Sequence, residues 1–77
     1  MPRTTTRTNG VAIRTIRVLS GLSVRDVVAR LDDLGVSAHP DHIRNLETGA
    51  RKGSREELVA ALATVLDVPF ETIASIR

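Results

Sequence analysis

Polar side chains that form directional hydrogen bonds are concentrated between residues 39 and 49. Pro40 suits the first position of a helix and Gly49 the position just past a helix end, which predicts a short helix over residues 40–48. Ile43 and Leu46 form the inward face of this helix. Its other positions carry Asp41, His42, Arg44, Asn45 and Thr48. A polar, hydrogen-bonding helix face is what recognition of the DNA major groove requires.

Other helices must hold this segment in place, because a helix of this length is unstable alone in water. The apolar period predicts four of them, over residues 11–20, 23–34, 54–66 and 70–76. Ser23 with Asp26, and Ser54 with Glu57, have the spacing of capping boxes that would open the second and fourth predicted helices. No segment alternates like a strand for long, so the sequence predicts an all-α fold of five helices.

Residues 1–10 have no apolar periodicity and are predicted to form a flexible basic arm before a single domain over residues 11–77. Arg3 and Arg7 could enter a minor groove or follow phosphates, as the arms of several DNA-binding families do. A solubilising tail without a binding function is the alternative.

The composition excludes several classes of function. With 77 residues, no cysteine and 1% aromatic residues, the chain lacks disulfides and the rings needed to stack single-stranded bases. No run is long enough to cross a bilayer and no signal peptide is visible, which predicts a cytoplasmic protein without a membrane partner. His39 and His42 lack further metal ligands, and no nucleophile has a plausible base. We therefore expect no metal, no cofactor and no enzyme activity.

The charges are segregated along the chain. Residues 1–25 carry +5, residues 26–47 carry −3, residues 48–55 carry +3 and residues 56–77 carry −3. Such segregation suits a domain with one surface facing phosphate and another facing water, although a solvated charge run would look similar.

Four short motifs occur in order along the chain: Ile13-Arg14-x-x-Arg17, Gly21-Leu22-Ser23, Ile43-x-x-Leu46-Glu47-x-Gly49 and Leu66-x-Val68-Pro69. Together they resemble the phage-repressor and Cro type of helix-turn-helix domain, also called the Xre family, over about residues 11–76. The resemblance implies a lambda-repressor-like domain whose third helix enters the major groove. Two departures, the extra stretch over residues 32–36 and Val28 in place of the usual alanine, imply an altered angle of that helix.

The resemblance also implies roles for single residues of the third helix. Asn45 would read adenine and Arg44 guanine, while Asp41 would accept from cytosine or simply favour the helix dipole. His42 would be a donor to a base or a spacer. Glu47 would form a partly buried salt bridge with Arg17 and so tie this helix to the first one.

Phosphate contacts follow from the same resemblance. Arg51, Lys52 and Arg55 would grip the DNA backbone after the third helix, unless they only form a solvated turn. Ser23 would hold a phosphate at the start of the second helix through backbone N–H groups. Arg14 and Arg25 are weaker candidates.

The sequence thus predicts a sequence-specific, double-stranded DNA-binding regulator of transcription, a repressor or Cro-like switch protein of bacterial or phage origin. One alternative is an antitoxin-like or regulator-docking module with a protein partner; another is an architectural or excision factor that bends DNA. A weak homodimer formed on DNA would use the arm, the DNA itself or the last helix, with Phe70 and Ile76 as its patch.

Overall fold

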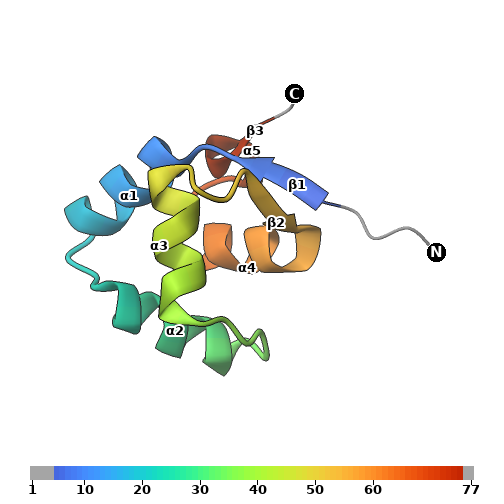
Figure 1. Cartoon of the computed structure of the whole chain (residues 1–77). Coiled ribbons are helices and arrows are strands. Elements are labelled where there is room, and N and C mark those ends of the chain that lie inside the picture. The colour runs from blue at the N-terminus through green and yellow to red at the C-terminus, as the bar shows by residue number, and fades with distance from the viewer. Residues whose placement is uncertain (1–4, 76–77) are drawn as a thin grey trace.

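The computed structural model describes residues 5–75, which form five helices and three short strands. The elements in order are β1 (Thr5–Thr8), α1 (Gly10–Leu19), α2 (Val24–Asp33), α3 (Pro40–Thr48), β2 (Gly53–Arg55), α4 (Glu56–Leu66), α5 (Phe70–Ile73) and β3 (Ala74–Ser75). The all-α prediction is therefore wrong. The fold is α+β, with five helices and a small antiparallel sheet (Figure 1).

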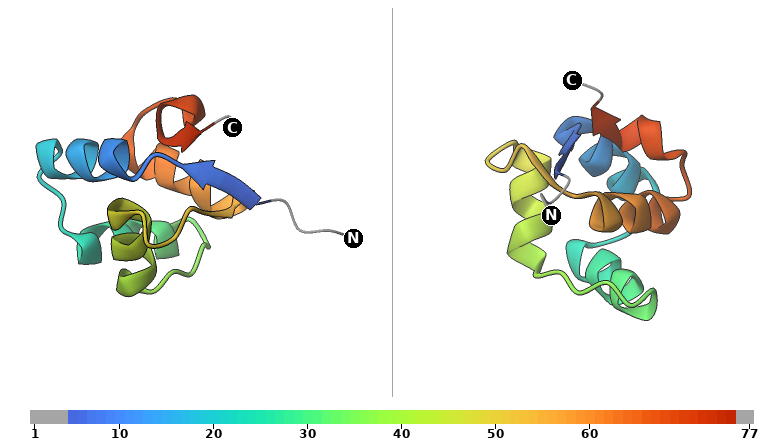
Figure 2. Two further views of the ribbon diagram at one scale, coloured as in Figure 1. Left: turned by 45° about the horizontal axis from the view of Figure 1, so that its top comes forward. Right: turned by 90° about the vertical axis from the view of Figure 1, so that its right-hand side faces the viewer.

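The sheet has the order β2-β1-β3 and lies at the end of the molecule away from α2 (Figures 1 and 2). Thr6 of β1 pairs with Ser54 of β2, and Thr8 pairs with Ala74 of β3. The predicted flexible arm is thus wrong from Thr5 onwards, while Arg3 lies outside the described residues. Threonine favours extended backbone, but the strand's partners are distant in sequence, so no local apolar pattern marks it.

The link between β1 and α1 is fixed by its own side chain and backbone. The Asn9 carboxamide oxygen accepts a hydrogen bond from the N–H of Ala12 at 3.1 Å, and the Asn9 N–H donates to the Ile73 carbonyl at 2.8 Å. At Gly10, a Cβ atom would lie 2.3 Å from the Leu46 carbonyl oxygen. Only glycine therefore allows the start of α1 to approach the end of α3 so closely.

Every helix contributes to one apolar core. Its most deeply buried side chains are Ile13, Val27, Leu31, Ile43, Leu46, Leu58, Val59, Leu62 and Ile73. Leu34, the last apolar residue of the predicted second helix, is instead 49% exposed, and Val36 in the following turn is buried. Gly35 makes this possible with a φ of 80°, because the Val36 N–H can then donate back to the Leu31 carbonyl at 2.9 Å.

The last two helices differ from their predicted bounds. Ser54 belongs to β2 and does not cap α4; Arg55 occupies the N-cap position and makes no side-chain cap bond. α5 ends at Ile73 because the next two residues pair with β1. Within residues 5–75, no helix has the length and apolar character needed to cross a bilayer.

The apolar patch predicted for a homodimer lies only in part within the described residues. Phe70 is partly buried against the core, and Ile76 lies outside the described residues. The exposed large apolar side chains of the described part of the chain are Val11, Val18, Leu19 and Leu34. Three of these four belong to α1.

Candidate nucleic-acid interface

Helix α3 has the bounds that its sequence predicts. Pro40 occupies the first turn, and Gly49 ends the helix in the left-handed conformation with a φ of 85°. His39 is the N-cap, where its Nδ1 atom accepts a hydrogen bond from the Asp41 N–H at 3.1 Å. The histidine that the sequence offered as a weak metal ligand thus caps the helix. Among residues 5–75 there is no group of three or more side chains suited to hold a metal ion.

The outward face of α3 carries Asp41, Arg44, Asn45 and Thr48, all exposed. An Arg44 Nη1 atom donates to the Asp41 carboxylate at 3.1 Å, so the acid holds the guanidinium along this face. The Asn45 backbone carbonyl accepts from the Arg51 N–H at 3.0 Å. The Asn45 carboxamide itself has no hydrogen-bond partner within the described residues and is available to a ligand.

His42 does not belong to that outward face. Its ring is half-buried on the side of α3 that faces β2, and its Nε2 atom lies 2.9 Å from the Ser54 hydroxyl. Burial is the main cause that lowers the pKa of His42, and the positive charges of Arg51 and Arg55 lower it further. The sequence predicts His42 on a flank of the helix, as a donor to a base or a spacer, and its ring lies on the flank that faces β2.

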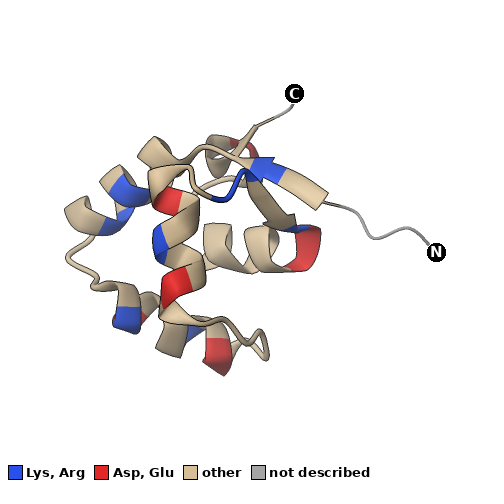
Figure 3. Ribbon diagram, viewed as in Figure 1, with Lys and Arg blue, Asp and Glu red and all other residues tan. Residues whose placement is uncertain are grey.

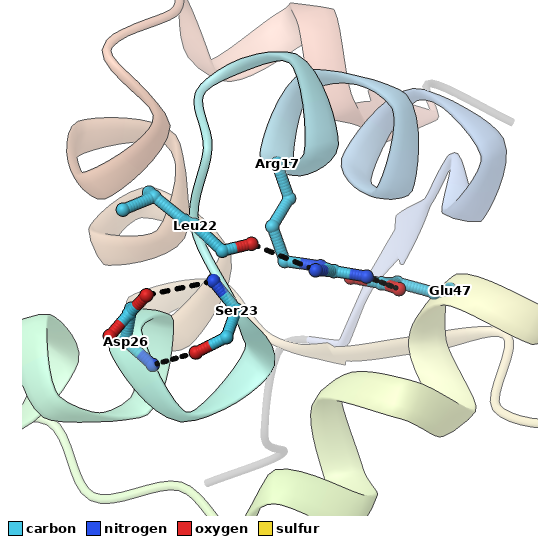
Figure 4. A network of polar contacts seen from close by, with 5 residues as sticks. All are labelled: Arg17, Leu22, Ser23, Asp26 and Glu47. Carbon is cyan, nitrogen blue, oxygen red and sulfur yellow. Dashed lines mark hydrogen bonds and ion pairs between the residues drawn. The ribbon is translucent and has the colours of Figure 1, made fainter.

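The flank of α3 that faces α1 is closed by the ion pair that the resemblance implies (Figure 4). Two nitrogens of the Arg17 guanidinium donate to the two carboxylate oxygens of Glu47, at 2.6 and 3.0 Å, and a third donates to the Leu22 carbonyl at 2.9 Å. The two side chains are only 13% and 5% exposed. These bonds to Glu47 raise the pKa of Arg17, so the guanidinium stays charged and its charge is paired with Glu47 inside the protein.

The start of α2 lies on the same flank and is closed by a capping box (Figure 4). The Ser23 N–H donates to the Asp26 carboxylate at 2.9 Å, and the Asp26 N–H donates to the Ser23 hydroxyl at 3.0 Å. The bond from the Ser23 backbone lowers the pKa of Asp26, which keeps this carboxylate charged. The Ser23 N–H is therefore already bonded, and the predicted phosphate contact at the start of α2 stays a prediction that would depend on other N–H groups of its first turn.

Two arginines on this flank stay exposed. Arg14 lines a shallow groove with Val24, Arg44 and Thr48, so it borders the outward face of α3. Arg25, in the first turn of α2, is also exposed.

The opposite flank is formed by β2 and the loop before it. Arg51, Lys52 and Arg55 are exposed there. The Lys52 carbonyl accepts from the Thr8 N–H at 3.1 Å, which brings β1 and its exposed Arg7 beside this loop. The predicted arm cation Arg7 thus sits on a fixed strand.

Basic residues border α3 on both sides. Figure 3 shows them on α1, on the start of α2, on the loop before β2 and on β1, with α3 between. In comparisons with known proteins, no family model, no curated protein and no solved structure matches this chain. A proposal for its function therefore rests on the geometry of its own residues.

The bond between His42 and Ser54 is the feature of this site that sequence reasoning missed. Ser54 precedes Glu57 at the spacing of a capping box, and that pattern pointed to a different role. Asn9 before Gly10 is the one missed signal that the sequence did offer, since asparagine is a preferred N-cap residue.

Proposed function

We propose that this protein is a sequence-specific, double-stranded DNA-binding regulator of transcription, of the phage-repressor and Cro type. The observation that carries the proposal is the outward face of α3, which is polar and exposed and has arginines on both flanks. The inward face of the same helix is anchored in the core by Ile43 and Leu46. The helix is thus a fixed support for side chains that face a ligand.

The proposed docking places α3 in the major groove. This groove is about 12 Å wide and admits a helix, and its two edges are sugar-phosphate backbones. Arg14 and Arg25 would contact one backbone, and Arg51, Lys52 and Arg55 the other. Such contacts set the orientation of the protein and supply most of the salt-dependent affinity.

Base reading is assigned to Asn45 and Arg44. The free carboxamide of Asn45 can pair with adenine N6 and N7, and the Arg44 guanidinium can donate two bonds to guanine O6 and N7. Asp41 holds Arg44 at 3.1 Å, so it would orient the guanidinium before DNA arrives. In this arrangement Asp41 is a positioning residue, because a carboxylate facing phosphates directly would be repelled.

The test is selection of duplexes from a random pool, followed by fluorescence anisotropy against unrelated DNA. We expect the selected site to bind on the order of 1,000-fold more tightly than unrelated DNA at physiological salt. The double variant Arg44→Ala, Asn45→Ala should lose this preference. Arg30→Ala, which removes an exposed arginine from the other end of α2, should retain it.

Other outcomes would redirect the proposal. Binding that follows salt alone and survives the double substitution would contradict base reading by α3. A circular-permutation gel that shows strong bending without sequence preference would favour an architectural or excision factor. The absence of any DNA binding would favour the protein-docking alternative. A selected site with two half-sites about 10 bp apart would support a homodimer formed on DNA.

A further inference from the structure

A small polar pocket lies beside α3, apart from its base-reading face. It is lined by Thr5, His42, Arg51, Gly53, Ser54 and Arg55, which come from β1, α3, β2 and the loop before β2. The His42 Nε2 atom and the Ser54 hydroxyl are 2.9 Å apart at this pocket. Three segments that are separate in the sequence thus bring hydrogen-bond donors and positive charge to one place.

The charges around this pocket are not balanced. Arg51 and Arg55 both act on His42 with their positive charge. The only carboxylate bonded to either of them within residues 5–75 is that of Glu57, 3.4 Å from the Arg55 Nε atom and itself 70% exposed. Asp41, next to His42 in the sequence, is engaged with Arg44 instead. Thr5 from β1 is neutral. Two arginines against this one exposed acid leave a net positive charge, which favours an anion.

We propose that His42, Arg51 and Arg55 hold one backbone phosphate of DNA in this pocket, and that His42 takes up a proton as the phosphate enters. The inference rests on the proposed function and adds a chemical property to it. DNA binding by this protein is then coupled to pH through a single histidine, which lies on the flank of α3 and reads no base.

The hydrogen bond to Ser54 explains how the ring can act on the anion. A ring that carries a proton on Nε2 donates it to the Ser54 oxygen, and the serine O–H is then free to donate to a phosphate oxygen. A ring without a proton on Nε2 instead accepts a hydrogen bond from the serine O–H, which then cannot donate to the phosphate. A phosphate in the pocket therefore favours a ring that carries a proton on Nε2, and its negative charge favours the doubly protonated, cationic ring.

The sign of the pH effect follows from these states. In the free protein, burial and the two arginines keep the pKa of His42 below its ordinary value of 6.5, so the ring is neutral at neutral pH. The phosphate offsets the arginines and raises that pKa in the complex. Affinity for DNA should thus increase as the pH falls from neutral through the pKa that His42 has in the complex. It should level off below the pKa that His42 has in the free protein.

The first experiment compares the affinity for a selected duplex at about pH 7.5 and about pH 5.5, at constant ionic strength. Wild type should bind about tenfold more tightly at the lower pH, which corresponds to a tenfold difference in proton affinity between free and bound forms. His42→Gln keeps a partner for Ser54 but cannot titrate, so its affinity should hardly change. His39→Asn replaces the only other histidine with another N-cap residue and should retain the wild-type pH response.

The second experiment separates this proposal from the proposed function. The pKa of His42 is measured by NMR in chloride, in inorganic phosphate at equal ionic strength, and with DNA. A rise in both phosphate and DNA supports the pocket. Specific DNA binding with an unchanged His42 pKa and a wild-type pH response in His42→Gln would overturn the pocket and leave the proposed function standing. A rise in phosphate without any DNA binding would refute the proposed function and the DNA phosphate as ligand, leaving only an anion pocket.

Discussion

Arg17 on one side of α3 and the arginines beside β2 on the other are used in opposite ways. On the side of α1, Arg17 is 13% exposed and gives three hydrogen bonds to Glu47 and to the Leu22 carbonyl. On the side of β2, Arg51 and Arg55 are exposed, and their neighbour is a histidine instead of a buried acid. Arg17 satisfies its charge inside the protein, while Arg51 and Arg55 leave positive charge exposed to solvent.

Under the proposed function, this difference separates structural arginines from those that would bind phosphate within one small domain. A buried cation needs a full set of partners, because burial without them costs several kcal/mol. An exposed cation has no such need and gains its energy on association. Net charge along the sequence does not distinguish the two; the burial of each guanidinium does, with Arg17 at 13% and Arg55 at 42% exposed.

The largest expected effect is on the closed flank. Glu47→Ala should lower the free energy of unfolding by about 3 kcal/mol, since it leaves the Arg17 charge partly buried without its main partner. Urea denaturation followed by circular dichroism measures this change. Glu57→Ala removes an exposed acid, 3.4 Å from Arg55, and should change stability by less than about 0.5 kcal/mol. Equal stability of Glu47→Ala and wild type would contradict the structural role given to the Arg17–Glu47 pair.

On the open flank, Arg51→Ala should act on binding and not on folding. We expect DNA affinity to fall about tenfold, and the slope of log affinity against log salt to decrease by about 1, as for the loss of one phosphate contact. The free energy of unfolding should stay within about 0.5 kcal/mol of wild type. A loss of stability with an unchanged salt slope would instead assign Arg51 to the fold.

A smaller effect is expected at the start of α2. Ser23→Ala removes the hydroxyl that accepts from the Asp26 N–H and should lower stability by about 1 kcal/mol. Ser37→Ala, at an exposed serine whose backbone carbonyl alone is bonded, should be neutral. DNA affinity of folded Ser23→Ala should match wild type. A tenfold loss of DNA affinity would indicate that the Ser23 side chain contacts a phosphate.

Much of α3 could be predicted from sequence, because its limits depend on local chemistry. Pro40 and Gly49 mark its ends through their own backbone preferences. The Arg17 partner of Glu47 came from the family resemblance, since thirty residues separate the two.

The sheet and the second flank could not be predicted in this way. The threonines of β1 pair with residues far along the chain, and short strands with polar side chains have no visible period. The partner of His42 depends on that pairing, because β1 fixes the position of β2 and hence of Ser54. Contacts that arise from tertiary pairing carry no local signal in one sequence.

The most direct test of the central claim is a map of NMR shift changes in 15N-labelled protein as a selected DNA duplex is added. The largest changes should occur on the outward face of α3, at Arg44, Asn45 and Thr48, and in the loop at Arg51 and Lys52. The Arg17 side chain should remain unchanged in its bond to Glu47. Changes confined to the exposed apolar side of α1, or none on α3, would contradict the account.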